Sequence, residues 1–370
     1  MTNDFPLKAN ENIIFPLRSL YDSYGYTHYK MSKFEEYDLY SKNKDFLVSD
    51  GVITFTDTDG KLMALKPDVT LSIVKNTKDS DALLQKLYYN ENVYRVSKST
   101  HTFKEIMQAG LECIGEIDAY CIFEVLSLAL KSLMTISENC VLDISNLALL
   151  MQAVDYAGIP DSEKSDVFRC IGEKNLHELS EKCASLGVAE EKYAVLKGLV
   201  SLHGTPEKVL PEAEKILAPV GCEDELSSFV KIIDALPNKE KINIDFSVID
   251  NVHYYNGIVF KGFIQGVPNS VLSGGQYDAL LIKMKLKKGA IGFAVYLDAL
   301  ELFATPRSEY DIDTVLLYGK ETPFDIIEKQ AKALRETGSV LAVEKIPENI
   351  RYRQLVDITD SEVNSVENDA

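Results

Sequence analysis

The sequence is short of positive charge. Its 39 Lys and Arg residues stand against 57 Asp and Glu residues, which gives a formal net charge of −18 at pH 7. Such a chain repels phosphate backbones, whose binding depends on neutralisation by Lys and Arg. Residues 306–370 hold no basic cluster either, with eight Lys and Arg residues and fourteen Asp and Glu residues. Nucleic acid is therefore not expected as a partner.

The sequence also lacks the spacings that mark metal sites and disulfide frameworks. Its six cysteines are scattered without a C-x-x-C pair, and its five histidines show neither H-x-H nor H-x-x-x-H spacing. These patterns predict buried, reduced thiols and no metal site, and we assign no cofactor.

No continuous run of about 18 apolar residues is present, which argues against a membrane span. The first twenty residues have neither the basic segment nor the continuous apolar segment of a secretion signal. We therefore expect a cytoplasmic protein.

The periodicity of apolar residues predicts two strand-rich regions around a helical one. Val52–Phe55 and Leu62–Leu65 flank an Asp-Gly turn and predict a β-hairpin. From about 160 to 238 the pattern becomes helical, and strand patterns return from Ile242. We predict an α+β fold with an antiparallel sheet in residues 1–305 and a helical insertion at about 160–238.

The last part of the chain, residues 306–370, predicts a β-α-β-like unit that is too short for a full domain. The pattern consists of DTVLLYG, a helix over Pro323–Glu336, and VLAVEK. We interpret it as a truncated C-terminal α/β module. Its acidic and polar end, DSEVNSVENDA, predicts disorder.

Five motifs follow one another in the predicted core. They are LKPDVT (Leu65–Thr70), YRVSKSTHTFKEIMQAGLE (Tyr94–Glu112), HYYNGIVF (His253–Phe260), SGGQYDAL (Ser273–Leu280) and AIGFAVYLDAL (Ala290–Leu300). In this order they are similar to the histidyl-tRNA synthetase family over residues 9–303. The resemblance implies a class II aminoacyl-tRNA synthetase-like antiparallel sheet with flanking helices.

In that family the matching segments surround histidine and ATP. The resemblance implies these histidine-binding residues: Asp68, Thr70, Arg95, Gln108, Glu112, Tyr254, Tyr255, Gly274 and Gly275. Tyr277 and Asp278 also match the Gly-Gly-Arg-Tyr-Asp turn of the family.

Strand geometry supports part of this assignment. Gln108 and Glu112 are four residues apart on a predicted strand and therefore share a face with Gly110. A carboxylate there can receive an α-ammonium group, and Gln108 can bond to that group or to an imidazole. The alternatives are a solvated outer-face carboxylate for Glu112 and ordinary strand packing for the tyrosine pair.

The departures from the family concern arginine. Formation of an adenylate requires arginines aimed at phosphate oxygens, and losing one charge-stabilising group in such a site commonly costs about 10²-fold or more in rate. Residues 1–305 contain just three arginines, Arg18, Arg95 and Arg169. By the resemblance, four arginine positions of the family are occupied by Lys66, Asp250, Gln276 and Ala299.

A synthetase-like core without these arginines, and without a full anticodon-binding domain, resembles the regulatory-subunit family of ATP phosphoribosyltransferase. This resemblance implies a non-catalytic subunit that joins a short-form catalytic subunit in the first step of histidine biosynthesis. It also implies histidine as a ligand that imposes feedback inhibition, and a homodimer within a hetero-oligomer. Two alternatives remain: a divergent histidyl-tRNA synthetase, and a stand-alone pseudo-synthetase that binds tRNA or another protein.

Overall fold

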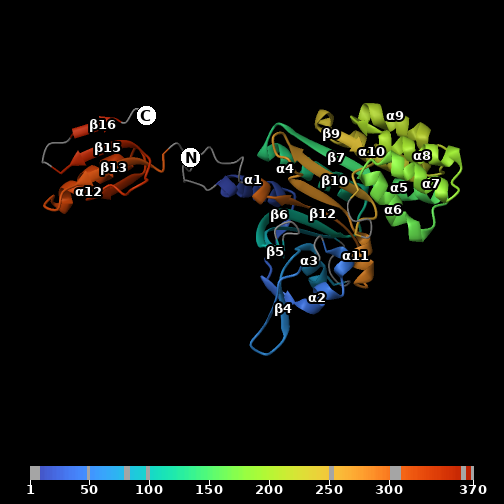
Figure 1. Cartoon of the computed structure of the whole chain (residues 1–370), viewed down its shortest axis with the longest axis horizontal. Helices are drawn as coiled ribbons and strands as arrows, with labels where there is room; N and C mark the ends of the chain where they lie inside the picture. Colours follow the sequence, from blue (N-terminus) through green and yellow to red (C-terminus); the bar gives the residue numbers. More distant parts are fainter. Residues whose placement is uncertain are drawn as a thin grey trace. The chain divides into compact units, whose positions relative to one another are not determined.

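The computed structural model describes residues 9–47, 51–78, 84–96, 101–249, 254–300, 310–359 and 364–367. The chain divides into two compact units, Met1–Ala304 and Thr305–Ala370 (Figure 1). The first unit is built on a nine-stranded sheet and the second on a four-stranded sheet.

The large sheet is mostly antiparallel. Its strands, in spatial order, are β1 (Thr27–His28), β5 (Leu84–Val96), β6 (Phe103–Gly115), β12 (Gly289–Tyr296), β11 (Leu272–Gln276), β10 (Ile258–Ile264), β7 (Cys140–Asn146), β9 (Ile242–Asp245) and β8 (His203–Gly204). The pairs β1–β5 and β7–β9 are parallel, and the other pairs are antiparallel. The predicted antiparallel α+β architecture is therefore confirmed.

Two helices, α1 (Ala9–Ser23) and α4 (Ala119–Ile136), pack against one face of this sheet. The Asp118 carboxylate caps α4 by accepting a hydrogen bond of 2.8 Å from the Cys121 amide. By length and composition α4 is apolar enough to cross a membrane, which the search for a continuous apolar run did not anticipate. Because 56% of it is buried inside the fold, we interpret it as a core helix.

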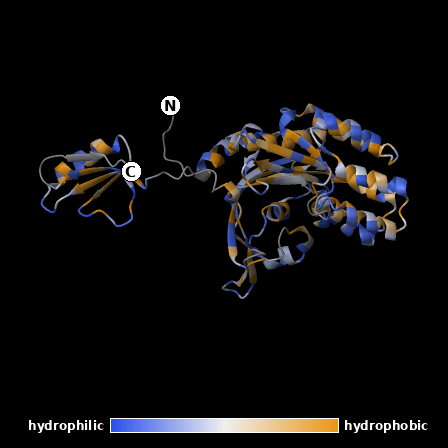
Figure 2. Cartoon of the chain, turned by 45° about the horizontal axis from the view of Figure 1, so that its top comes forward, coloured by the Kyte–Doolittle hydropathy of each residue, from blue (hydrophilic) through white to orange (hydrophobic). Residues whose placement is uncertain are grey.

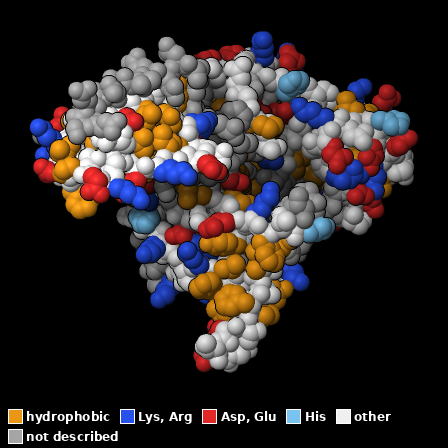
Figure 3. Space-filling view, turned by 60° about the vertical axis from the view of Figure 1, so that its left-hand side comes forward, with side chains coloured by type: hydrophobic (Ala, Val, Ile, Leu, Met, Phe, Trp, Pro, Cys, Tyr) orange, Lys and Arg blue, Asp and Glu red, His pale blue; other side chains and the backbone are white. Residues whose placement is uncertain are grey.

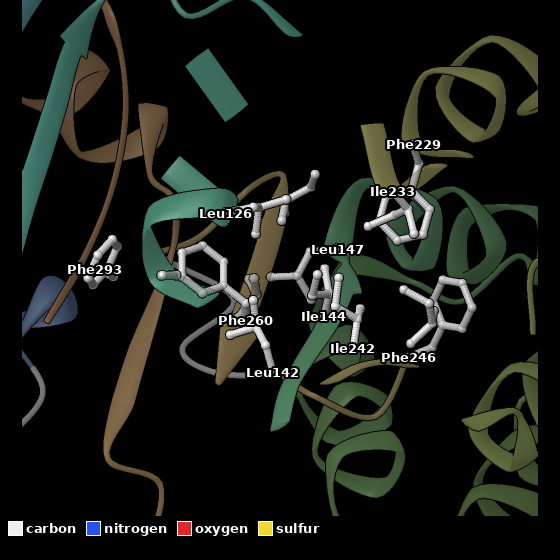
Figure 4. Packing of buried hydrophobic residues seen from close by; sticks show 14 of the residues in the cluster. Leu126, Leu142, Ile144, Leu147, Phe229, Ile233, Ile242, Phe246, Phe260 and Phe293 are labelled. Atoms are coloured by element: carbon white, nitrogen blue, oxygen red, sulfur yellow. The ribbon is translucent and has the colours of Figure 1, made fainter. Parts of the chain in front are cut away.

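The helical region packs against the far end of the sheet. It comprises α5 (Leu147–Ala157), α6 (Asp161–Gly172), α7 (Leu176–Ser185), α8 (Glu190–Ser201), α9 (Pro206–Leu217), α10 (Glu223–Ala235) and the 3-10 turn η2 (Lys239–Lys241). These helices carry both hydrophobic and hydrophilic residues (Figure 2). The core runs without a break from the sheet into this region: Phe260 packs against Phe293, and Phe229 of α10 packs against Phe246 (Figure 4).

A smaller lobe covers part of the opposite sheet face. It contains β2 (Phe34–Glu36), β3 (Thr54–Thr56) and β4 (Leu62–Leu65), in the order β2-β4-β3, with α2 (Tyr37–Ser41), η1 (Lys44–Phe46) and α3 (Thr70–Asn76). The predicted hairpin is confirmed, since Thr54 pairs with Ala64 and the Asp57 carboxylate accepts hydrogen bonds from the amides of Asp59 and Lys61. Hydrophobic side chains gather on this lobe (Figure 3), and Phe34, Phe55 and Leu62 are exposed.

The second unit has the strand order β14-β13-β15-β16, with β13 (Ile312–Tyr318), β14 (Val340–Val343), β15 (Tyr352–Ile358) and β16 (Asn364–Glu367). Helix α12 (Phe324–Arg335) packs on β13 and β14. The prediction of disorder at the chain end was wrong for β16, because its residues pair with Gln354–Asp357 of β15. Cross-strand backbone hydrogen bonds stabilise this segment despite its polar composition.

Three other details differ from the predictions. The sequence pattern predicts a polar loop containing Lys98, His101 and Lys104 between two strands, but Lys104 belongs to β6, because β5 and β6 pair along their whole length up to Val96–Phe103. Strand β7 was not predicted, and Asn146, at its end, caps α5. The pattern also predicts a helix over Leu297–Phe303, where the structure has a 3-10 turn, η3 (Asp298–Leu300); residues 301–309 lie outside the described residues.

Candidate functional site

A cavity of about 190 Å³ lies against the sheet face opposite α1 and α4. Strands β5, β6 and β12 form its floor, and the segment that leads into α3 and the segment that precedes β10 form its walls. It is lined by Phe46, Leu47, Asp68, Val69, Thr70, Tyr89, Arg95, Gln108, Glu112, Tyr254, Tyr255, Ser273, Tyr277, Gly292, Phe293, Ala294 and Tyr296.

Glu112 of β6 is the most enclosed acid in this cavity, with 2% of its surface exposed. The Thr70 hydroxyl donates a hydrogen bond of 2.7 Å to Oε1, and the Tyr277 hydroxyl donates one of 2.5 Å to Oε2. Gly292 makes room for the carboxyl, because a β-carbon at this position would overlap with Oε2. The alternative of a solvated carboxylate is therefore wrong.

Burial raises the pKa of the Glu112 carboxyl to about 8. The hydrogen bonds from Tyr277 and Thr70 favour the ionised form and limit this rise, whereas the charge of nearby Asp68 adds to it. Among the described residues no Lys or Arg forms an ion pair with Glu112. The carboxyl therefore holds its proton more tightly than an exposed glutamate does, and an approaching positive group would favour its ionisation.

Asp68 is the second buried acid of the cavity, with 8% of its surface exposed. It accepts a hydrogen bond of 2.8 Å from the Leu71 amide in the first turn of α3. Burial raises the pKa of Asp68, and the Leu71 amide and the Arg95 guanidinium oppose this rise. The Arg95 side chain is itself engaged, since its Nε donates to the Pro67 carbonyl at 2.9 Å.

Tyrosine rings form one wall. The rings of Tyr254 and Tyr255 meet edge to face with centroids 4.6 Å apart, and Tyr277 lies 5.5 Å from Tyr254. Burial raises the pKa of Tyr254 and of Tyr277 well above the ordinary value, so both hydroxyls remain protonated donors. The tyrosine pair precedes β10 rather than lying within it, so strand packing does not account for it.

The structure brings together most of the residues implied by the family resemblance. Those that line the cavity are Asp68, Thr70, Arg95, Gln108, Glu112, Tyr254 and Tyr255. Gly274 and Gly275 do not line it and act by being small: a β-carbon on Gly274 would strike Phe293, and one on Gly275 would lie 2.7 Å from the Tyr255 ring.

Three residues of the cavity were not among the predicted site residues. They are Tyr277, which donates to Glu112, the buried Tyr89, and Gly292, which leaves room for the Glu112 carboxyl. Tyr277 had a signal, because it belongs to a matched motif. Tyr89 had a weaker one, since strand alternation places it on the same face as Arg95. Gly292 had none, because its role depends on a pairing with Glu112 that joins distant segments.

Three of the four positions at which the resemblance implies a family arginine lie among the described residues. The Gln276 amide donates to Asp278 at 2.7 Å, and Lys66 forms an ion pair with Glu91 at 2.5 Å. Ala299 lies in η3 and packs against the core, and Asp250 lies outside the described residues. Among the described lining residues, Arg95 is therefore the one permanent cation.

The arrangement suits a small ligand that carries a cation and several N–H groups. Two buried acids and the Gln108 amide can accept hydrogen bonds, and three tyrosine rings can enclose a flat group. A single arginine would neutralise only a small part of the negative charge of a triphosphate. In the described part of the chain no group of three or more His, Cys, Asp or Glu side chains is placed to hold a metal ion.

Comparison with known proteins agrees with this geometry. Residues 6–300 match the family model described as histidyl-tRNA synthetase. The chain is 29% identical over 357 residues to the ATP phosphoribosyltransferase regulatory subunit of Clostridium kluyveri. The aligned region covers 93% of this chain and 90% of that protein.

Two solved structures share the fold. One is an ATP phosphoribosyltransferase regulatory subunit/histidyl-tRNA synthetase from Bacillus halodurans, with a TM-score of 0.78, 24% identity and 97% of each chain covered. The other comes from an ATP phosphoribosyl transferase (HisG:HisZ) complex of Thermotoga maritima, with a TM-score of 0.59, 19% identity, and 80% of this chain and 98% of that chain covered. With the family model matching most of its length, the chain belongs to the histidyl-tRNA synthetase family.

Proposed function

We propose that this chain is a non-catalytic regulatory subunit of ATP phosphoribosyltransferase, which joins a short-form catalytic subunit in the first step of histidine biosynthesis. The observation that carries the proposal is a cavity with two buried acids, Glu112 and Asp68, and a single arginine among its described lining residues. The resemblance adds that three arginine positions of the family hold Lys66, Gln276 and Ala299. The regulatory-subunit relatives that cover most of this chain support it.

We propose free histidine as the ligand of the cavity. Its α-ammonium group and imidazole together need acceptors, which Glu112, Asp68 and Gln108 supply, and Thr70 orients the Glu112 carboxyl. Tyr255 and its neighbours enclose the ring. The α-carboxylate requires a donor, for which Arg95 and backbone amides near Gly274 are the candidates.

In the proposed role, histidine inhibits the complex by binding more tightly to its less active state. Coupling between two sites is typically about 1 to 3 kcal/mol and is reciprocal. The partner must therefore change the histidine affinity of this chain by the same factor as histidine changes the affinity for the partner.

The test is reconstitution with a short-form catalytic subunit, with phosphoribosyl transfer measured with and without histidine. Calorimetry on the same complex compares wild type with Glu112→Gln, which should weaken histidine binding by about 1.5 to 3 kcal/mol, the range for a hydrogen bond to a charged group. Glu105→Gln, an exposed glutamate on the same strand, serves as the matched control. Unchanged affinity and unchanged inhibition in Glu112→Gln would place the histidine sensor outside this cavity, with the catalytic subunit as the next candidate.

We further propose that the chain forms a homodimer inside the hetero-oligomer, because paired cores are the usual way to cover the segment Leu17–Tyr40 in class II folds. We also propose a cytoplasmic location. All six cysteines are free thiols and five of them are buried, which suits a reducing compartment.

A further inference from the structure

The segment that places Asp68 and Thr70 in the cavity is held in position by Lys66, which precedes both residues in the sequence. This side chain has 0% of its surface exposed, and its Nζ lies 2.5 Å from Glu91 Oε2 on β5. The main chain is tied down as well, because the Lys66 amide donates to Lys33 and the Lys66 carbonyl accepts from Tyr94. Lys66 is therefore fixed by its side chain and by both of its backbone groups.

The acid partner is also tied to the site. Glu91 pairs directly with Gln108 across β5 and β6, and the side chains of such pairs share a sheet face. The other carboxyl oxygen of Glu91 accepts from the Met31 amide at 3.4 Å. Glu91 thus connects Lys66 to the strand that carries Gln108 and Glu112.

From these contacts we infer that Lys66 and Glu91 form a positioning pair, which sets the places of Asp68 and Thr70 relative to Glu112. This inference rests on the proposed histidine site. The Thr70 hydroxyl must lie 2.7 Å from Glu112 Oε1, and Thr70 follows Lys66 by four residues. A shift of the anchor moves this hydroxyl and the Asp68 carboxylate together.

Stability alone does not explain such a pair. Two charges removed from water lose hydration, and replacing a buried ion pair by uncharged side chains of similar volume is often neutral or stabilising. Burial lowers the pKa of Lys66, and Glu91 opposes that effect; Lys33 and Glu35 are the other charged groups nearby. What the charged pair adds is one defined geometry, because the fully buried Lys66 ammonium must meet the partly buried Glu91 carboxylate directly.

The test is the double variant Lys66→Met/Glu91→Gln in the full-length chain. It removes both charges, keeps an acceptor for Met31, and should fold. Histidine affinity, measured by calorimetry, should fall about tenfold or more, because small displacements of positioned groups carry costs of this order. Lys66→Arg, which restores the family residue and keeps a cation opposite Glu91, should retain wild-type affinity.

The matched control is Lys86→Met/Glu124→Gln. This partly buried pair, 2.7 Å apart, links β5 to α4 on the sheet face away from the cavity, so its loss should leave histidine affinity unchanged. Equal histidine affinity in Lys66→Met/Glu91→Gln and in wild type would overturn the positioning role.

A second readout does not depend on histidine. The ¹³C carboxyl resonance of Glu112 reports its titration, which should shift in Lys66→Met/Glu91→Gln as the Thr70 hydroxyl moves, and should not shift in the control. A wild-type chain that binds no histidine would refute the proposed ligand, while the Glu112 titration would still decide whether the pair positions Thr70. If the Glu112 titration is the same in Lys66→Met/Glu91→Gln and in wild type, the positioning role is refuted, whichever ligand the cavity binds.

Discussion

Replacing Glu112 by glutamine removes a buried titrating group and keeps the size of the side chain. The folded state raises the pKa of this carboxyl from 4.5 to about 8, so the folded protein favours the protonated form. The stability that this preference contributes is fully present below pH 4.5 and is lost as the pH rises towards 8. At about 1.4 kcal/mol per pH unit, the loss is at most about 5 kcal/mol.

Glutamine does not titrate, so Glu112→Gln should be close to wild type in stability at pH 4.5 and more stable above pH 8. The difference in the free energy of unfolding should grow steadily between these limits. Urea unfolding of both proteins at one-unit pH steps, without histidine, measures it. Glu105→Gln, at an exposed position of the same strand, is the control for the substitution itself. Parallel pH profiles for wild type and Glu112→Gln would refute the account of Glu112 as a buried, neutral acid.

Three further outcomes follow from the site and the fold. The isolated chain should show no histidine-dependent ATP–pyrophosphate exchange above background; measurable exchange would favour a divergent synthetase instead. Gly292→Ala should destabilise the protein by about 2 kcal/mol and abolish histidine binding, because the new methyl group overlaps with the Glu112 carboxyl. The control Gly172→Ala, whose new methyl group would have its nearest neighbour at 3.7 Å, should change stability by less than about 0.5 kcal/mol. Light scattering at micromolar concentration should give at least the mass of a dimer, and a monomeric mass would remove the proposed self-association.

Local pattern was enough to predict the parts of the site that lie along one strand or in one motif. Alternation along β6 placed Gln108 and Glu112 on one face, and the structure has both in the cavity. The hydrogen bond from Tyr277 to Glu112 joins residues 165 positions apart, and a single sequence gives no measure of such a contact. The burial of Lys66 was equally hidden, because lysine is among the residues least often buried and becomes so only with a partner.

The fold shows the same division. The strand pattern expected from Ile242 onwards is confirmed by β10, whose apolar residues pack on both faces of the sheet. Strand β7 was missed because CVLDISN runs directly into the helix that follows: Asn146 ends the strand and caps α5, so no loop separates the two elements. Strand β16 was missed because its pairing with β15, and not its polar composition, determines its structure.

We propose that this chain keeps the residues that bind a ligand and lacks those that catalyse adenylate formation. Recognition of a cationic amino acid requires buried acceptors, and these are kept in Asp68, Gln108 and Glu112. Adenylate formation requires guanidinium groups that meet the phosphates more strongly in the transition state than in the ground state. The proposed role requires such differential stabilisation to be small, and it is supported by Arg95 being the one permanent cation among the described lining residues, with its Nε engaged by the Pro67 carbonyl. In the proposed role the ligand therefore leaves unchanged, and its binding free energy remains available to shift the population of states in the complex.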